Sequence, residues 1–176
     1  LDSEDTPFRT LLVPEAGGLA VALGGNPAAL AAIEALPATG SGRLIHARKQ
    51  VKLLADGAFF SHLMQMGPPG YIDGHHGEWL MEPPALEAAA RAYWNAGYTI
   101  HVHANGDAGV GATLDVLQTL LEEKPRFDHR FTLHHYGYST PEQARRLAAL
   151  GAAVSANPNY LYVLADKYGE QGLGTD

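Results

Sequence analysis

The sequence contains no cysteine. Disulfide bonds and thiolate metal sites are therefore excluded, and a metal ion would have to be held by histidine, by a carboxylate or by a modified side chain. Histidine is plentiful by contrast, with nine in 176 residues. Imidazole is thus the metal-binding group to look for first.

Basic clusters and long hydrophobic runs are also missing. Lys and Arg number 12 against 19 Asp and Glu, for a formal net charge of −7, so we expect no nucleic-acid partner. Apolar runs are broken by Gly, Pro or charge well before the ~18 residues that a membrane span needs. Residues 1–10 are acidic where a signal peptide would be basic and then apolar. We expect a cytoplasmic protein without a membrane partner.

The chain is long enough for one globular domain, since 46% of its residues are hydrophobic and its glycines and prolines show no fixed repeat. Short apolar stretches alternate with amphipathic segments of ten or more residues, a pattern typical of parallel βα units and therefore of the α/β class. We expect strands at 8–14, 43–48, 51–57, 98–104, 130–135 and 152–158, and helices at 26–37, 84–97, 108–123 and 141–150. A chain of 176 residues with these elements is too short for a complete eight-fold barrel, which takes ~250 residues.

Helix signals are clear at two of these segments. Asn26 is the expected N-cap of the first helix, with Pro27 at its first position. For the last helix, a capping box can form either from Ser139 to Glu142 or from Thr140 to Gln143.

Residues 58–83 are too rich in Gly, Pro and His for a regular element and too aromatic for an unstructured linker. We interpret them as a long functional loop. His75, His76 and Trp79 are candidate substrate-binding residues there, although a solvated histidine pair and aromatics that simply pack the loop explain the same composition.

The stretch HVHANGD places His101 and His103 on one face of a strand. His103 lies at the carboxyl end, where α/β proteins build their sites, so it is the better candidate ligand, whereas a packing role suits His101. Asn105-Gly106-Asp107 forms the following corner. Asp107 can cap the next helix, act in catalysis, or do both.

His134 and His135 end the next strand, and a parallel sheet would bring one of them beside His103. Adjacent strand residues point in opposite directions, so the register should decide which one. Lys52 can enter the same face from the strand at 51–57, or can extend its ammonium to water. The remaining histidines, among them His46, His62 and His129, have no partner at ligand spacing and are expected to be structural.

The segments VKLLADG, IHVHANGD, LHH and SANP, in this order on successive strands, resemble the amidohydrolase superfamily and within it the YtcJ-like metal-dependent hydrolases. The resemblance runs roughly over residues 51–160. It implies that His103 and His135 are metal ligands and that Lys52, once carboxylated, bridges two metals. It also implies a divalent metal, with zinc as the expected ion in one or two copies, and places Asp107 in the corner motif of the family.

The sequence lacks the His-x-His of the first strand and the Asp of the last strand in that family, and carries His134 where a Glu is usual. We therefore expect residues 1–176 to form the central part of a TIM-type (β/α)8 barrel, about its third to seventh strands. Two open sheet edges would then favour self-association.

The expected function is hydrolysis of carbon–nitrogen bonds in a small-molecule substrate by metal-activated water, with this part of the barrel inactive alone. Lys52 and Asp107 are its expected catalytic residues. The alternative is a metal-free structural or interaction module.

Overall fold

The centre of the molecule is a four-stranded parallel sheet. The structure, a computed structural model, describes residue 5 and residues 7–37 and 44–174. The sheet follows the chain order β3 (Gln50–Leu54), β4 (Thr99–Ala104), β5 (Thr132–His135) and β6 (Ala153–Ala156). This confirms the predicted α/β class with parallel βα units.

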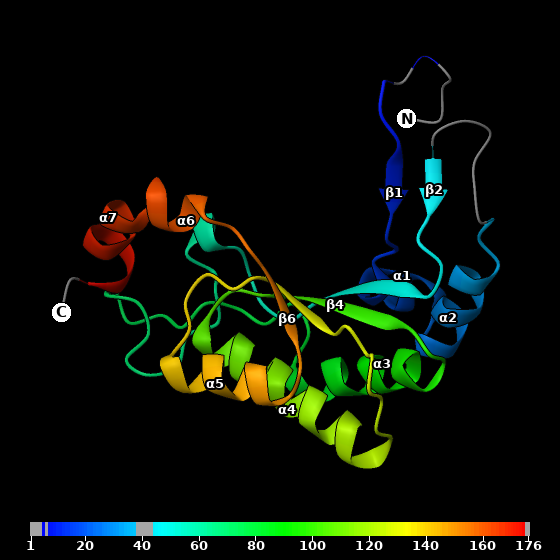
Figure 1. Ribbon diagram of the computed structural model, residues 1–176. Helices are drawn as coiled ribbons and strands as arrows, with labels where there is room; N and C mark the ends of the chain where they lie inside the picture. The colour runs from blue at the N-terminus through cyan, green and yellow to red at the C-terminus, as the bar shows by residue number, and fades with distance from the viewer. Residues whose placement is uncertain (1–4, 6, 38–43, 175–176) are drawn as a thin grey trace.

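Three helices cover one face of the sheet (Figure 1): α3 (Pro83–Asn95), α4 (Asp107–Glu123) and α5 (Pro141–Ala149). Strand residues alternate between buried and half-buried along β3 and β4, because every second side chain points into the helical layer. The buried set packs against the helices and forms the main core, with Val51, Leu53, Ile100, Val102 and Leu133 from the strands and Leu86, Tyr93, Val110, Leu114 and Leu117 from the helices.

Of the two capping boxes predicted for the last of these helices, α5, only one forms. Thr140 is its N-cap; the hydroxyl of Thr140 accepts from the Gln143 amide, and the Gln143 side chain accepts from the Thr140 amide. The box from Ser139 to Glu142 does not form.

The N-terminal part adds a two-stranded parallel sheet of β1 (Thr10–Leu12) and β2 (Leu44–His46), together with α1 (Ala16–Leu23) and α2 (Asn26–Glu34). Helix α1 was not predicted, because AGGLAVAL contains two glycines and has no polar face. The Glu15 carboxylate starts it by accepting from the amides of Gly17 and Gly18. The predicted N-cap of α2 was wrong by one residue: Gly25 occupies that position and Asn26 is already helical.

No single helix in the described ranges is long and apolar enough to cross a membrane. Helices α1 and α2 meet that test only as a pair, and they are bent by 113° where they join.

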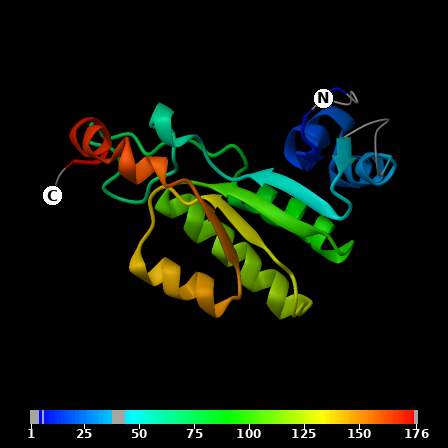
Figure 2. The same cartoon turned by 45° about the horizontal axis from the view of Figure 1, so that its top comes forward.

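The predicted loop after β3 folds against the end of the chain. Figure 2 shows it beside α6 (Asn159–Tyr162) and α7 (Ala165–Tyr168), at the opposite end of the sheet from β1 and β2. A 3₁₀ turn, η1 (Phe59–Ser61), and a π-helical turn, η2 (Gly169–Leu173), belong to this region. Its aromatic and methionine side chains form a second core of Phe59, Met64, Met66, Tyr71, Tyr160 and Tyr168.

The sheet does not close into a barrel within the described residues. Strand β3 gains one hydrogen bond on its outer side, from the Lys52 amide to the Pro14 carbonyl at 2.8 Å. All four residues of β6 are exposed at the other edge. The fold is thus the partial barrel that the sequence predicts, with a free strand at β6.

Candidate functional site

The polar side chains of the strands gather on the sheet face that the three helices leave free. Register pairs Lys52 with His101, and His103 with His134. Because the strands are parallel, side chains at the same depth on neighbouring strands lie beside each other. The site therefore forms from residues that are distant in sequence, such as Lys52 and His134, which are 82 positions apart and lie on β3 and β5, on either side of β4.

His103 and His135 lie together at the carboxyl ends of β4 and β5. Their ring centroids are 4.5 Å apart, with an interplanar angle of 63°. Half-burial lowers the pKa of both rings, that of His103 to about 4, so both are neutral at pH 7 and keep a lone pair for a ligand.

The backbone of His135 explains how it reaches this position. Its φ is 74°, and that of Tyr136 is 52°, so the chain leaves the extended conformation at the last residue of β5. His134 keeps the strand alternation and contacts His101 with centroids 5.1 Å apart, while the twisted His135 contacts His103. The expectation that only one of the two adjacent histidines can face the site was therefore wrong.

A hydrogen-bonded row crosses the free face below this pair. The Gln50 Oε1 lies 3.1 Å from His101 Nε2, His101 Nδ1 lies 3.2 Å from His134 Nε2, and His134 Nδ1 lies 2.8 Å from Lys52 Nζ. Gln50 Oε1 only accepts, so His101 donates to it from Nε2, His134 donates to His101, and Lys52 donates to His134. The row thus sets the direction of the lysine N–H bond.

The surroundings of Lys52 favour its neutral form by lowering the pKa of its ammonium group. Burial lowers its pKa to about 8, because the ammonium is poorly solvated between the strands. Burial and then the nearby Lys52 lower the pKa of His134 to about 4, so this ring is a neutral acceptor for the lysine.

Asp56 and Asn105 support the pair and were not predicted as functional. The buried Asp56 carboxylate accepts three amide hydrogens, from Gln65, Asn105 and Gly106, at 2.8 to 3.0 Å. Burial nevertheless raises its pKa to about 6. Asn105 Nδ2 lies 2.9 Å from His103 Nε2 and donates to the Gly57 carbonyl at 3.1 Å. The sequence alone predicts that Asp56 is part of an Asp-Gly turn. An Asp-Gly pair in a turn and a buried aspartate that binds backbone amides look the same in the sequence.

Asp107 ties the long loop to α4. It is the first helical residue, and the N-cap is Gly106, so the predicted side-chain cap does not form. Its Oδ1 accepts from the Gly67 amide at 2.8 Å. This carboxylate holds the loop over the carboxyl end of the sheet.

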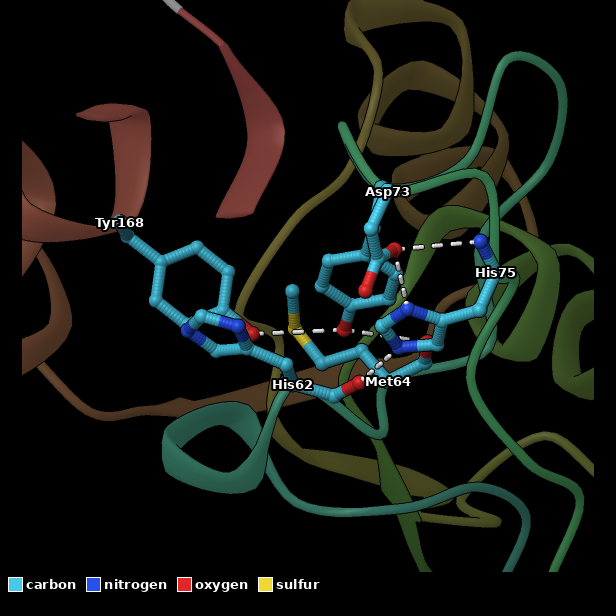
Figure 3. Close-up of polar contacts among 6 residues, drawn as sticks. His62, Met64, Asp73, His75 and Tyr168 are labelled. Carbon is cyan, nitrogen blue, oxygen red and sulfur yellow. Dashed lines mark hydrogen bonds and ion pairs between the residues drawn. The ribbon is translucent and has the colours of Figure 1, made fainter. Parts of the chain in front are cut away.

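His75 belongs to a polar cluster inside the loop (Figure 3). Its Nδ1 lies 2.6 Å from Asp73 Oδ1, and its Nε2 lies 2.6 Å from the His62 carbonyl oxygen. Both oxygens only accept, so both ring nitrogens must carry a hydrogen for the two bonds to form together, and these bonds, the one to His62 first, raise the pKa of His75. The ring also stacks on Tyr71 at 4.2 Å, and Tyr71 Oη meets Tyr168 Oη at 3.3 Å. His75 therefore fastens the loop.

The other two predicted substrate-binding residues also have contacts within the loop region. His76 Nδ1 faces the Met66 carbonyl at 3.1 Å, and Trp79 forms a β-bridge with Asp56.

A cavity of about 490 Å³ opens directly beside His135, between the β5–α5 loop and helices α6 and α7. Its walls are largely aromatic, with Phe59, Tyr136, Tyr138, Tyr160 and Tyr168. His75, His76 and Trp79 are not among the residues that line it. The space next to the histidine pair is thus formed mainly by the C-terminal segment.

The donor set fits a divalent metal in part. The part of the chain that the structure describes contains no group of three or more His, Asp or Glu side chains arranged around a common point. The two neutral imidazoles nevertheless lie side by side, and Lys52 would supply a carboxylate once it carries carbon dioxide on Nζ. Two imidazoles and one carboxylate are a ligand set that zinc accepts.

Comparisons with known proteins agree with this architecture. Residues 7–175 match the model of the amidohydrolase family. An uncharacterized metal-dependent hydrolase from Pyrococcus furiosus has a similar structure, with a TM-score of 0.68 and 20% sequence identity over 95% of this chain and 32% of that one. Another from Pyrococcus horikoshii OT3 has a TM-score of 0.63 and 23% identity over 82% of this chain and 29% of that one. No curated protein sequence matches. The chain spans about a third of the length of these two solved structures.

Proposed function

The chain belongs to the amidohydrolase family, and on that premise we propose that it forms part of a metal-dependent hydrolase that cleaves carbon–nitrogen bonds in small amide-like molecules. The observation that carries the proposal is the approach of the His103 and His135 rings to 4.5 Å at the carboxyl ends of two neighbouring parallel strands. This is the edge at which barrels of βα units build their active sites.

In this proposal His103 and His135 hold a divalent metal, for which zinc is the best match to imidazole ligands. A bound metal of this kind lowers the pKa of a water ligand and polarises the carbonyl under attack. The chain keeps both imidazoles neutral by burial, and the Gly57 carbonyl, 3.3 Å from His103 Nε2, can accept the N–H of that nitrogen and so leave the Nδ1 lone pair free. Orientation by such a neighbour is the usual support for a metal-binding histidine.

Lys52 is proposed as a carboxylated ligand that bridges to a second metal ion. Its neutral amine would attack carbon dioxide, which forms a nitrogen–carbon bond and releases one proton to solvent. The lowered pKa of about 8 supports this step because it increases the neutral fraction of the amine. The carbamate retains one N–H, and His134 Nδ1, 2.8 Å from Nζ, is positioned to accept it.

Asp107 is proposed as a positioning residue of this site. It acts through the Gly67 amide that it binds, and so holds the loop over the carboxyl end of the sheet. Reaction with a small-molecule substrate also requires the rest of the barrel, because the chain spans only about a third of the matched structures.

Calorimetric titration of the 176-residue chain with zinc chloride, with and without bicarbonate, tests the proposal. We expect saturable binding that His103→Ala combined with His135→Ala weakens by about 100-fold or more, since both imidazole ligands are lost. Lys52→Ala should remove only the effect of bicarbonate. The matched control is His46→Ala, which removes an imidazole from β2.

Absence of saturable binding, or equal binding by the double variant, would contradict the proposal. The metal-free structural module would then be the better description of this chain. Circular dichroism of each variant separates lost ligands from lost folding.

A further inference from the structure

The wall of the cavity beside His135 is uncharged as far as the described residues form it. Among residues 5, 7–37 and 44–174, none that lines it is Asp, Glu, Lys or Arg, although such residues make up 18% of the sequence. The lining therefore offers no counter-ion to a charged ligand.

Aromatic stacking makes the inner wall of this cavity rigid. Phe59 lies between two tyrosines, 4.1 Å from the Tyr160 ring and 4.0 Å from the Tyr168 ring by centroids. Phe59, Tyr160 and Tyr168 all belong to the second core. Stacked rings present flat apolar surface at little cost in conformational entropy, and flat ligand rings pack well against such surfaces.

The cavity reaches one member of the histidine pair, His135. Tyr160 Oη lies 3.4 Å from His135 Nδ1, and both residues line the cavity. A volume of about 490 Å³ is within the range of small-molecule sites. A ligand group in the cavity would thus have its polar end at His135.

We propose that this cavity binds the uncharged aromatic substituent of an amide substrate and discriminates against substrates with a carboxylate or an ammonium at that position. The proposal rests on the function proposed above and names its substrate class. Its physical reason is that an ion entering the cavity loses water without gaining a partner, whereas a neutral ring gains apolar contact.

Binding of three fluorescent naphthalene probes to the metal-free 176-residue chain, followed by fluorescence anisotropy, tests the proposal. We expect 1-naphthylacetamide, which is neutral, to bind about tenfold more tightly than 1-naphthylacetate and 1-naphthylmethylammonium, because only the two ions lose solvation. The cation is needed because the net charge of −7 by itself would favour it over the anion. Acetamide, used as a competitor, should not displace the neutral probe.

A charge placed at the cavity should reverse the selectivity. Leu161 lines the cavity and is 80% exposed, whereas Val163 follows two residues later at 61% exposure outside the lining. Leu161→Lys should tighten binding of 1-naphthylacetate by about tenfold, and Val163→Lys, the matched control, should leave it unchanged.

Equal affinity for the three probes, or the same response in both lysine variants, would overturn the proposal. Because these measurements use no metal, their outcome is independent of the zinc titration. If the chain binds the neutral probe selectively but does not bind zinc, the proposed hydrolase function is rejected and the proposed selectivity of the cavity stands.

Discussion

At the scale of single residues, the site depends on one departure from strand geometry. His135 is not glycine, yet it has φ of 74°, a region that bulky residues enter rarely. An extended backbone would direct this ring away from the face that bears His134. The conformation places both histidines on the same side of the sheet. The His135 ring is then available to the candidate metal, and the His134 ring contacts Lys52. Such backbone outliers concentrate at functional sites.

His75 provides a residue-scale prediction on pH. Its pKa is raised above the unfolded value of 6.5, by the bond to the His62 carbonyl and then by Asp73. The doubly bonded ring therefore stabilises the loop fully below pH 6.5, and this contribution is lost as pH rises through the folded pKa. We expect the protection factors of the Tyr71 and Ile72 amides, measured by NMR and thus corrected for base-catalysed intrinsic exchange, to fall over that rise.

Asp73→Asn should lower the His75 pKa and shift the transition to lower pH. The control His76→Gln should leave the transition in place. A loop whose exchange shows no such transition, or one that persists in His75→Gln, would refute this interpretation of the cluster.

At the scale of elements, a glycine sets how closely α4 approaches Asp56, which follows β3. A Cβ on Gly109 would lie 2.6 Å from Asp56 Oδ2, whereas one on Gly111 would have its nearest contact at 3.4 Å, with Gln143 Nε2. The first turn of α4 therefore packs directly on the carboxylate that anchors the corner after β4. This contact joins three elements that the sequence separates.

The same substitution at these two glycines should have opposite effects. Gly111→Ala should raise the free energy of unfolding by about 0.5–1 kcal/mol, because alanine favours the helix. Gly109→Ala should lower it by about 1–3 kcal/mol, because the added methyl displaces the Asp56 side chain. Urea denaturation of both variants measures the two values, and equal shifts would show that α4 does not pack as described.

At the scale of the whole molecule, the exposed edge is the main feature. Within the described ranges, strand β6 has a partner on one side only, and Val154 in this strand is 40% exposed. Unpaired backbone groups beside an apolar surface are a template for strand addition by another chain. Self-association of this chain therefore remains a prediction of its topology.

Sedimentation velocity over a range of concentrations tests this prediction. We expect the chain to associate as concentration rises, and Val154→Lys to suppress the association because a charge at the edge opposes strand pairing. Val21→Lys, on α1 at 86% exposure, is the control that makes the same change in charge elsewhere. A chain that stays monomeric throughout, or equal suppression by both variants, would exclude β6 as the contact.

Local periodicity in the sequence was sufficient to predict the α/β class and the position of His103 at a strand end, since these depend on neighbours within a few residues. It also placed Lys52 and the histidines of 134–135 on strands, which the structure shows to be β3 and β5, on either side of β4. Only the tertiary structure decided that His135 turns toward His103, that Asp56 is buried under three amides, that His75 fastens the loop, and that an uncharged cavity lies beside the pair. The physical reason is that each of these depends on packing between segments that are distant in sequence, or on a backbone conformation that such packing holds in place.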